Sequence, residues 1–463
     1  MSPVVKTPLS VVVLAAGQGT RMKSSLPKVL HTIAGQPLLV HVINDALELA
    51  AVDIHVVFGH GGDQVQAALA DFNVSWVEQA EQLGTGHAVE QALPAIPDDH
   101  LVLLLYGDVP LITVETLKRL IAVSVLENGD DALALLTATL DDPTGYGRIV
   151  RDNAGNVLAI VEQKDASPEQ LAIDEINTGM LAVKGALLKK WIKQLDNNNA
   201  QGEYYLTDIV GLAVSDGVTV STANPTERCE IEGVNNKRQL AELERAFQLR
   251  QARVLMDEGL TLRDPARFDL RGELSIGRDV VIDVNVLIEG HVELADGVVI
   301  GPNCILKNVR IGRGTQIQAN SLLEDSVVGE HCDIGPYARL RPQTQLADKV
   351  KVGNFVEIKK SEIAEGSKVN HLSYVGDTTM GANVNVGAGT ITCNYDGANK
   401  HQTIIGDNVF IGSDTQLVAP VTIADGATIG AGSTITHDAV ANELTLSRSK
   451  QVCVPGWHRP KKK

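Results

Sequence analysis

The sequence predicts an α/β domain with a Rossmann-like, mostly parallel sheet, followed by a parallel β-helix of six-residue repeats. Apolar strand-like runs alternate with helical patterns in the first half, aliphatic residues recur every six positions in the second half, and a long helical pattern separates the two. A chain of 463 residues is long enough for two or three domains that each bury a core. We therefore expect domains at 1–235 and 263–463, joined by a helical linker at 236–262.

The first half carries strand-like runs at 10–16, 55–59, 74–79 and 101–106, and a helical pattern at 38–49. The apolar runs are continuous rather than alternating, which is typical of strands that are buried on both faces of a parallel sheet. Ligands of such sheets bind outside the carboxyl ends of the strands. The residues that follow each run are therefore candidates for a site.

The linker is predicted from a helical pattern that ends at Gly259 and is followed by an Asp-Pro pair, which are typical helix stops. Its apolar residues recur near helical spacing, at Leu240, Leu243, Phe247, Val254 and Leu255.

The second half repeats every six residues from Ile276 onward. Six-residue periodicity is the signature of a parallel β-helix, in which three short strands and their turns form one coil. The aliphatic side chains would point inward and stack on their counterparts in the next coil, which agrees with an aromatic content of only 3%. Three series keep this spacing: Ile276, Ile282, Ile288, Leu294, Ile300 and Leu306; Val328, Ile334, Leu340, Leu346, Val352 and Ile358; and Ile405, Ile411, Leu417, Ile423, Ile429 and Ile435.

Composition and charge exclude several classes of protein. No apolar stretch approaches the roughly 20 residues that span a bilayer, and the short run at 11–16 lacks the features of a secretory signal, so we expect a cytoplasmic protein without membrane contact. The formal net charge of −17 argues against nucleic-acid binding but not against small anionic substrates, which need only local positive groups. Five dispersed cysteines without a Cys-x-x-Cys pair indicate free thiols rather than disulfides or a zinc site.

A glycine loop, LAAGQGTRM at 14–22, follows the first strand-like run. The dinucleotide fingerprint would need a glycine in place of Met22, and a P-loop would need Gly-Lys-Ser/Thr, so neither motif fits. The loop can instead present backbone N–H groups to phosphates, with Arg21 and Lys28 nearby to compensate negative charge. The alternative is a tight strand-to-helix turn with solvated basic residues.

Polar residues follow the other runs. Asp108 ends an apolar strand, where a carboxylate can hold Mg²⁺ beside bound phosphates, although an Asp that starts a turn before Pro110 is the alternative. Gln79 with the LGTG segment at 83–86 offers amide and backbone groups suited to base recognition. The segments GYGR at 145–148 and NTG at 177–179, with Glu162, offer partners for sugar hydroxyls. Singly, each of these features is compatible with a structural role.

The six-residue rhythm is interrupted between Asn370 and Gln402, and we expect a second site there. Regular coils seldom tolerate such a stretch, because its backbone needs new hydrogen-bond partners. A histidine in a turn is often only a surface residue, but clustered basic residues nearby suit a phosphosugar. The stretch contains His371, Tyr374, Asn385, Ala388, Asn394 and Tyr395, and Arg339, Arg341, Lys359 and Lys360 precede it.

Together these motifs resemble the sugar-phosphate nucleotidyltransferases. The segments LAAGQGTRM, LPKVL, EQLGTGHA, YGDVPL, PTGYGR, EQKD, EINTG and EGVNN follow one another as in that family. With the hexapeptide half, the chain is similar over residues 9–459 to the bacterial bifunctional N-acetylglucosamine-1-phosphate uridyltransferases/glucosamine-1-phosphate acetyltransferases. The resemblance implies a left-handed β-helix, a homotrimer whose acetyl sites are built from adjacent subunits, and synthesis of UDP-N-acetylglucosamine for cell-wall and lipopolysaccharide precursors.

For the first domain, the resemblance implies uridylyl transfer from UTP to N-acetylglucosamine-1-phosphate, with Arg21 as the catalytic cation and Asp108 and Asn235 as the Mg²⁺ ligands. The sugar phosphate would attack the α-phosphorus of UTP in line and expel pyrophosphate, so catalysis consists of aligning two anions and neutralising charge. Gln18 stands where relatives commonly carry Lys, which removes one cation. The implied UTP and sugar-phosphate contacts are Leu14, Ala15, Ala16, Gly17, Lys28, Gln79, Gly84, Thr85, Tyr106, Gly107, Asp108, Gly147, Glu162, Asn177 and Asn235.

For the second domain, the resemblance implies acetyl transfer from acetyl-CoA to glucosamine-1-phosphate. His371 would take a proton from the 2-amino group, a role that suits a pKa near neutrality. The tail at 461–463 is either a solvated end or an aid to binding the coenzyme phosphates. The implied glucosamine-1-phosphate contacts are Arg341, Lys359, Tyr374 and Asn385, and the implied acetyl-CoA contacts are Ala388, Asn394, Tyr395, Ser413, Ala431 and Arg448.

Two other functions stay open on the sequence. One is a single-activity sugar-phosphate nucleotidyltransferase whose β-helix only trimerises it, against which His371 and the interrupted coils argue. The other is a non-catalytic sugar-nucleotide sensor, for which Asp108, Asn235 and Arg21 would be unnecessary. We favour an enzyme that acetylates first and uridylylates second.

Overall fold

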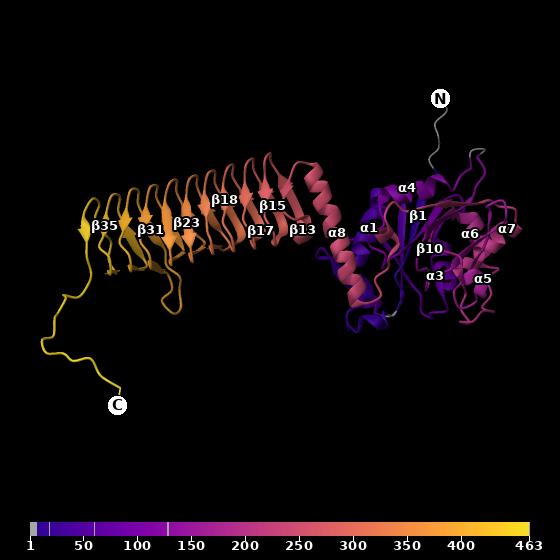
Figure 1. The fold of residues 1–463 in the computed structure, drawn as a ribbon, viewed down its shortest axis with the longest axis horizontal. Helices are drawn as coiled ribbons and strands as arrows, with labels where there is room; N and C mark the ends of the chain where they lie inside the picture. Colours follow the sequence, from indigo (N-terminus) through magenta and orange to yellow (C-terminus); the bar gives the residue numbers. More distant parts are fainter. Residues whose placement is uncertain (1–6, 18, 60, 127–128, 463) are drawn as a thin grey trace, which may run out of the picture. The chain divides into compact units, whose positions relative to one another are not determined.

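The computed structural model describes residues 7–17, 19–59, 61–126 and 129–462, and the chain divides into two compact units, Met1–Phe247 and Gln248–Lys463. The first unit is α/β, and the second consists of stacked parallel strands (Figure 1). The predicted fold class is confirmed in both.

A nine-stranded sheet forms the centre of the first unit, with the main order β11–β7–β10–β6–β1–β4–β5. β1 pairs in parallel with β4 and β6, and β4 with β5, so the carboxyl ends of these strands meet at one edge. β10 runs antiparallel to β6 and β7, which makes the sheet mixed. The strands are β1 (Leu9–Leu14), β4 (Asp53–Phe58), β5 (Ser75–Glu78), β6 (Leu101–Tyr106), β7 (Leu133–Thr139), β8 (Arg148–Arg151), β9 (Val157–Val161), β10 (Glu175–Lys184) and β11 (Val220–Ala223), and β2 (Thr32–Ile33) and β3 (Gln36–Pro37) form a separate pair.

Both faces of this sheet are buried, because successive residues of β1 alternate between two cores. Val11 and Val13 pack in one core, and Val12 and Leu14 pack in the other. This two-sided burial is the reason for the continuous apolar runs. The helices are α1 (Leu38–Glu48), α2 (Gly62–Ala68), α3 (Thr85–Ala92), α4 (Val114–Ala122), α5 (Pro168–Leu171), α6 (Gly185–Ile192) and α7 (Ile209–Ser215), with 3₁₀ turns at Thr20–Met22, Lys28–Leu30, Leu93–Ala95, Leu206–Asp208 and Arg228–Ile231.

The long helix α8 (Lys237–Asp257) belongs to both units. Leu243, in its first part, packs in a small core with Met22 and Leu38. Ala252 and Leu255, in its second part, belong to the core of the second unit. Within the described residues, no helix combines the length and the apolar character needed to cross a membrane.

The second unit is a parallel β-helix whose coils have three sides after β19. One side is an 11-stranded sheet: β12 (Thr261–Leu262), β14 (Val281–Ile282), β16 (Val299–Ile300), β18 (Gln316–Ile317), β20 (Asp333–Ile334), β23 (Lys351–Asn354), β26 (Lys368–His371), β29 (Asn385–Val386), β32 (Phe410–Ile411), β35 (Thr428–Ile429) and β37 (Leu444–Thr445). We call it the His371 side.

A 15-stranded sheet supplies the other two sides. It begins with long strands, β13 (Phe268–Ile276), β15 (Val286–Leu294), β17 (Ile305–Ile311) and β19 (Leu322–Val328), preceded by a 3₁₀ turn at Pro265–Arg267. It then splits into a second side, which we call the Arg341 side: β21 (Arg339–Leu340), β24 (Glu357–Lys359), β27 (Tyr374–Gly376), β30 (Ile391–Cys393), β33 (Gln416–Val418) and β36 (Thr434–Ile435). The third side is β22 (Thr344–Leu346), β25 (Glu362–Ile363), β28 (Thr378–Met380), β31 (Thr403–Ile405) and β34 (Val421–Ile423).

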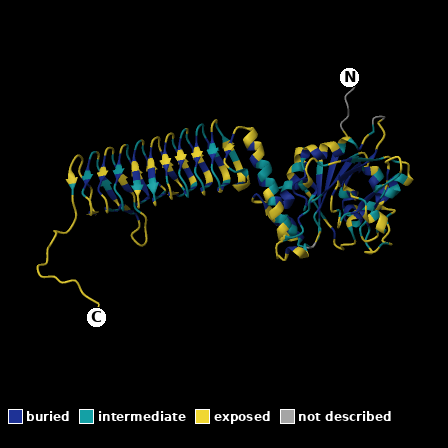
Figure 2. Cartoon of the chain, viewed as in Figure 1, coloured by how far each residue is buried: buried dark blue, intermediate teal, exposed yellow. Residues whose placement is uncertain are grey.

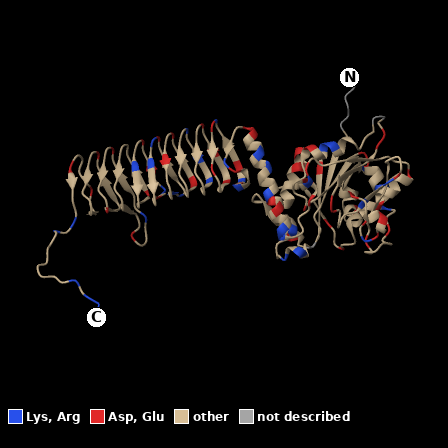
Figure 3. Cartoon of the chain, in the orientation of Figure 1, with Lys and Arg blue, Asp and Glu red and all other residues tan. Residues whose placement is uncertain are grey.

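One continuous aliphatic core fills the β-helix (Figure 2). Residues of the six-residue series pair in register from coil to coil, as Ile282 does with Ile300; Ile300 pairs in turn with Ile317, which stands outside the series. Charges of both signs lie outside the core (Figure 3), and some form ladders between coils, such as Arg310 Nε with Glu293 Oε2 at 2.7 Å. The six-residue periodicity therefore marks the residues whose side chains point into the core, as predicted.

The interruption of the coils is shorter than the sequence suggests. The expected break at 370–402 is wrong in extent, because β26 to β29 continue the regular pairing. The periodicity is hidden there because the inward series shifts by one residue: Val375 is followed by Met380, which pairs with Ile363, rather than by Gly381. Buried Ser373 and Thr378 bond to the backbone, Ser373 Oγ to His371 O at 2.8 Å and Thr378 Oγ1 to Gly376 O at 3.0 Å. Only 394–402, which we call the inserted loop, leaves the coil between β30 and β31 (Figure 1).

Candidate functional site

A cavity of about 490 Å³ lies beside the carboxyl ends of β1 and β6 in the first unit. Its position agrees with the rule for ligand sites in parallel sheets. Most of the predicted nucleotide contacts line it, and Val29, Gln82, Ala88 and Glu203 line it in addition to them. The predicted residues in its wall are Leu14, Ala15, Ala16, Gly17, Lys28, Gln79, Gly84, Thr85, Tyr106 and Asp108.

The glycine loop forms one wall of this cavity, and the segment after it returns close to the loop. Gly19 has a φ of 61°, and a Cβ there would lie 2.8 Å from Cβ of Lys28. Glycine is therefore required both for the left-handed conformation and for the close approach of Lys28. The prediction about the charge at Gln18 lies outside the described residues.

Four polar residues from three segments that are distant in the chain converge beside this loop. Lys28 Nζ donates a hydrogen bond to Asp108 Oδ2 and lies 3.4 Å from Asn235 Oδ1. Arg21 Nη2 donates to the same Asn235 oxygen at 2.9 Å. The cationic groups of Arg21 and Lys28 and the side-chain oxygens of Asp108 and Asn235 thus lie in one small region. A bound polyphosphate with its counter-ion requires such an arrangement.

Asp108 and Asn235 fit a hard divalent cation. Their side-chain oxygens both approach the Lys28 ammonium group, so they lie close to one another. Mg²⁺ is commonly held by one or two carboxylate or carbonyl oxygens together with substrate phosphates. Among the described residues, no cluster of three or more His, Cys, Asp or Glu could hold a metal by itself.

Gln79 is buried at the far side of the cavity, with 4% of its surface exposed. Its amide nitrogen donates to Gly84 O at 3.1 Å and lies 3.2 Å from His87 Nδ1. These contacts fix the side chain against the first turn of α3. Gln82, which the sequence analysis missed, donates to Ala16 O at 3.0 Å and ties this wall to the glycine loop.

A second cavity of about 210 Å³ shares Thr85 and Tyr106 with the first. Gly147, Glu162 and Asn177 line it, as predicted residues for a sugar, and Thr207 lines it without having been predicted. Thr207 Oγ1 donates to Glu162 Oε1 at 3.1 Å. Burial raises the pKa of Glu162, and burial also raises the pKa of Tyr106.

The two adjoining cavities give the first unit room for two joined ligands. Lys28 and the buried amide of Gln79 line the larger cavity, and the carboxyl of Glu162 lines the smaller one. Gly107 is buried beside them, and a Cβ there would lie 3.3 Å from Cβ of Ala15. The structure therefore brings most of the predicted contacts of the first domain to the walls of these two cavities, and it places Asn235 beside Lys28 and Arg21.

On the β-helix, one column of residues at a corner connects the predicted base with three of the predicted acetyl-CoA contacts. Gly389 N donates to His371 O at 3.2 Å, Asp414 N to Ala388 O at 2.7 Å, and Gly432 N to Ser413 O at 2.8 Å. Consecutive coils thus stack His371, Ala388, Ser413 and Ala431 in one line. Arg448 Nη1 donates to Ala431 O at 2.9 Å at the end of the column.

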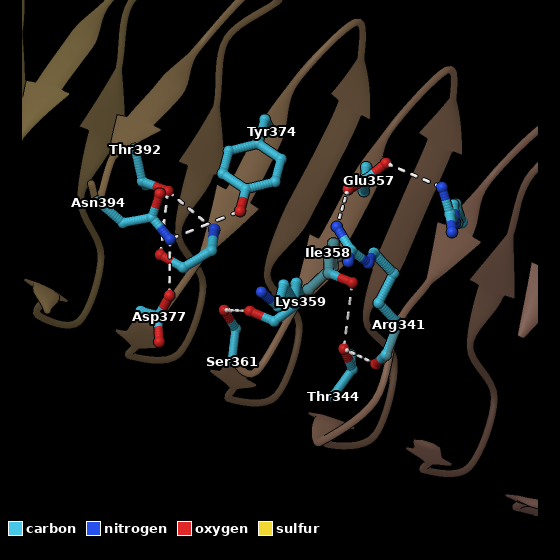
Figure 4. Close-up of polar contacts among 12 residues, drawn as sticks. Arg341, Thr344, Glu357, Ile358, Lys359, Ser361, Tyr374, Asp377, Thr392 and Asn394 are labelled. Carbon is cyan, nitrogen blue, oxygen red and sulfur yellow. Dashed lines mark hydrogen bonds and ion pairs between the residues drawn. The ribbon is translucent and has the colours of Figure 1, made fainter. Parts of the chain in front are cut away.

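The predicted sugar-phosphate residues lie around the corner, on the Arg341 side (Figure 4). Arg341 Nη1 donates to Glu357 Oε1 at 2.8 Å, and Arg339 lies 3.7 Å from the other oxygen of the same carboxylate. Contact with the Lys400 side chain, helped by the charge of Arg341, lowers the pKa of Lys359. Lys400, which was not predicted, therefore joins a cluster of cations suited to a phosphate.

The inserted loop is anchored at the same face (Figure 4). Asn394 Nδ2 donates to Asp377 Oδ2 at 2.6 Å, and Lys360 Nζ lies 3.3 Å from Asp377 Oδ1. Asn394 Nδ2 is also 3.5 Å from the hydroxyl of Tyr374. Tyr395 follows in the loop and is exposed, with its hydroxyl donating to Gly397 O at 2.6 Å.

Asn385 does not lie with the other predicted sugar-phosphate residues. It belongs to β29 on the His371 side and pairs there with Lys368 and Phe410. Arg341, Lys359 and Tyr374 occupy the adjacent side of the coil. Within one chain, the predicted acetyl-transfer residues therefore fall on two sides that meet at a corner.

The fold and these sites define a nucleotidyltransferase joined to a hexapeptide transferase. Residues 11–166 match the family of MobA-like NTP transferase domains, and residues 402–437 match the bacterial transferase hexapeptide family. Residues 270–354 also match the GMPPB C-terminal domain. The chain belongs to the family of the bifunctional protein GlmU: it is 60% identical to the bifunctional protein GlmU of Marinobacter nauticus over 456 residues, which cover 98% of this chain and 100% of that protein.

Among solved structures, the chain is similar to a nucleotidyl transferase from Methanothermobacter thermautotroptrophicus. The identity is 19%, the TM-score is 0.38, and the match covers 53% of this chain and 100% of that one. Family membership makes the present chain a bifunctional transferase with one nucleotidyltransferase and one hexapeptide transferase domain.

Proposed function

We propose that this chain makes UDP-N-acetylglucosamine in two steps, acetylation of glucosamine-1-phosphate and then uridylylation of the product. The proposal takes the domain boundaries as 1–235 and 263–463, with 236–262 as the linker. It rests on family membership together with the two separate sets of polar residues described above. The relative is named only as a bifunctional protein, so the substrates are our inference.

For uridylylation, we propose that UTP occupies the larger cavity and N-acetylglucosamine-1-phosphate the smaller one. Arg21 and Lys28 would bind phosphate oxygens and neutralise the charge that builds up during in-line attack on the α-phosphorus. Gln79 would contact the base, and Glu162 and Asn177 the sugar. Asp108 and Asn235 would hold Mg²⁺, which when bound supplies further neutralisation of the phosphates.

For acetylation, we propose that His371 accepts a proton from the 2-amino group of glucosamine-1-phosphate. The amine nitrogen then bonds to the thioester carbonyl of acetyl-CoA, the C–S bond breaks, and the coenzyme leaves as a thiol that takes up a proton. Arg341, Lys359, Tyr374 and Asn385 would bind the sugar phosphate. The column of Ala388, Ser413, Ala431 and Arg448, with Asn394 and Tyr395, would bind the coenzyme.

We propose that the protein is a homotrimer whose acetyl site is completed by a second copy. The corner between the two sides carries a ridge of Tyr337, Phe355 and Leu372, which are 51%, 55% and 64% exposed. All three adopt left-handed backbone conformations, with φ of 57°, 57° and 50°, where bulky side chains are disfavoured by about 1–2 kcal/mol each. The rings of Tyr337 and Phe355 stack with centroids 5.1 Å apart. A second subunit packed on this ridge would cover its apolar surface.

We propose that the protein acts in the cytoplasm on small anionic substrates, without nucleic-acid or membrane partners. The cysteines of the described chain are free thiols, which suits a reducing compartment, and the net charge is −17. The product would supply cell-wall and lipopolysaccharide precursors.

The single observation that carries the proposal is the contact among Arg21, Lys28, Asp108 and Asn235, from three segments distant in the chain, beside the cavity that Lys28 and Asp108 line. Purified full-length protein should release pyrophosphate from UTP only with N-acetylglucosamine-1-phosphate and Mg²⁺, and should consume acetyl-CoA only with glucosamine-1-phosphate. Pyrophosphate release without acetyl transfer would reduce the chain to a single-activity nucleotidyltransferase with a structural β-helix. Ligand binding without either reaction would make it a sensor.

A further inference from the structure

We propose that Asn354 is a positioning residue for His371: its amide oxygen accepts the Nδ1 proton of the imidazole and leaves Nε2 free as the base. The proposal rests on the proposed acetyl transfer at His371. Asn354 Oδ1 lies 3.0 Å from His371 Nδ1. An amide oxygen can only accept a hydrogen bond, so the ring nitrogen that faces it carries the proton. The other nitrogen of the neutral ring then holds the lone pair.

The β-helix itself aligns this pair. Asn354 ends β23 and His371 ends β26, and the two residues are direct partners in the parallel register. Leu372 N donates to Asn354 O at 3.2 Å, and Gly389 N donates to His371 O at 3.2 Å. Both backbones are therefore held by coil-to-coil pairing rather than by a loop, which is the rigidity that a positioned side chain requires.

The contact would matter because His371 is otherwise exposed. An exposed imidazole exchanges between tautomers and rotamers, and only one combination presents a lone pair to the substrate. The bond also favours the imidazolium that forms when His371 takes the proton, since a cationic donor strengthens the bond to the amide oxygen. Asn354 would thus hold the ring in one orientation before and after it takes up the proton.

The test uses full-length Asn354→Ala and Asn354→Asp, with Gln316→Ala as a matched control. Gln316 is an exposed amide of β18 on the same sheet as Asn354. We expect Asn354→Ala to lower kcat for acetyl transfer about 10- to 100-fold, with KM for glucosamine-1-phosphate changed by less than about 3-fold. The acid limb of kcat/KM should move to lower pH. Asn354→Asp keeps an acceptor, so it should recover most of kcat and move the acid limb to higher pH.

The outcomes separate this inference from the proposed function. An Asn354→Ala protein that matches Gln316→Ala in kcat and acid limb overturns the inference, whereas full acetyl transfer by His371→Ala overturns the proposed base itself. If Asn354→Asp has no more acetyl-transfer activity than Asn354→Ala, the hydrogen-bond acceptor at position 354 is not what supports acetyl transfer. Thermal unfolding checks that each variant is folded. If Asn354→Ala is unfolded, the inference is tested by the direction in which the acid limb of kcat/KM moves in the near-isosteric Asn354→Asp.

Discussion

Lys28 donates a hydrogen bond to Asp108, although 80 residues separate them in the chain. Asp108 lies just after the end of β6, and Lys28 lies just after the glycine loop that follows β1. The pairing of β1 with β6 therefore brings the two residues together. The ammonium group compensates a carboxylate that would otherwise repel a polyphosphate. A substitution that removes the charge of either residue would therefore leave the charge of the other uncompensated.

Asp108→Asn should abolish uridylyl transfer, with a loss of at least about 100-fold, and leave acetyl transfer unchanged. The amide keeps the shape but removes the charge that holds Lys28 and the proposed cation. Pyrophosphate release and thiol release measured on the same preparation check this. Asp99→Asn, an exposed acid of the same unit, serves as the control. Loss of both activities in a folded Asp108→Asn protein would contradict the division of labour.

His371→Ala should do the reverse, lowering acetyl transfer by about 100- to 10,000-fold and leaving uridylyl transfer intact. The reason is that the proposed base has no role in the first unit. Thiol release from acetyl-CoA measures the loss, and His437→Ala, an exposed histidine of the same β-helix, is the control. Equal acetyl transfer by the two variants would rule out His371 as the base.

Glu162→Gln should stabilise the first unit at neutral pH. Burial raises the pKa of Glu162, so its ionisation costs more in the folded chain than in the unfolded one. That penalty is present above the folded pKa and vanishes below the unfolded value near 4.5. We expect the variant to melt about 1–3 °C higher at pH 7.5, with the difference closing toward pH 4.5. Melting curves across this pH range test the prediction, and KM for the sugar phosphate is a second readout. A lower Tm of Glu162→Gln at pH 7.5 would contradict the prediction.

Phe355→Asn should weaken self-association without unfolding the coil. Asn tolerates the left-handed conformation better than Phe, as Asn303 and Asn320 show at other left-handed turns of the β-helix. Loss of the ring removes part of the exposed ridge. Sedimentation velocity should show smaller species, and acetyl transfer should fall with dilution while uridylyl transfer does not. Val299→Thr, which changes an exposed residue away from the ridge, is the control, and an unchanged assembly in Phe355→Asn would exclude the ridge as the interface.

The β-helix could be predicted well because one spacing along the sequence determines which residues point inward. Aliphatic residues at six-residue spacing mark the inward positions directly, and Ile282 and Ile300 lie in the core as expected. The same rule overstated the interruption, since the inward series shifts by one residue from Val375 to Met380 while the coil continues.

The candidate sites could be predicted only where a residue's own segment carried a motif. Lys28 and Asp108 stand next to recognisable segments, and the structure places both at the cavity. Thr207 and Lys400 carry no local signal, because each reaches its site through loop contacts with distant segments. Asn354 was missed for a similar reason: it meets His371 only because the coil returns after 17 residues.

Each coil of the β-helix pairs only with the coils directly before and after it. Residues 263–335 carry none of the side chains that we assign to acetyl transfer, yet they share the continuous core with those that do. Arrays of this kind tolerate gain or loss of whole repeats, because each new boundary resembles the old one. The early turns can thus gain or lose a coil while the residues that we assign to acetyl transfer keep their own neighbours.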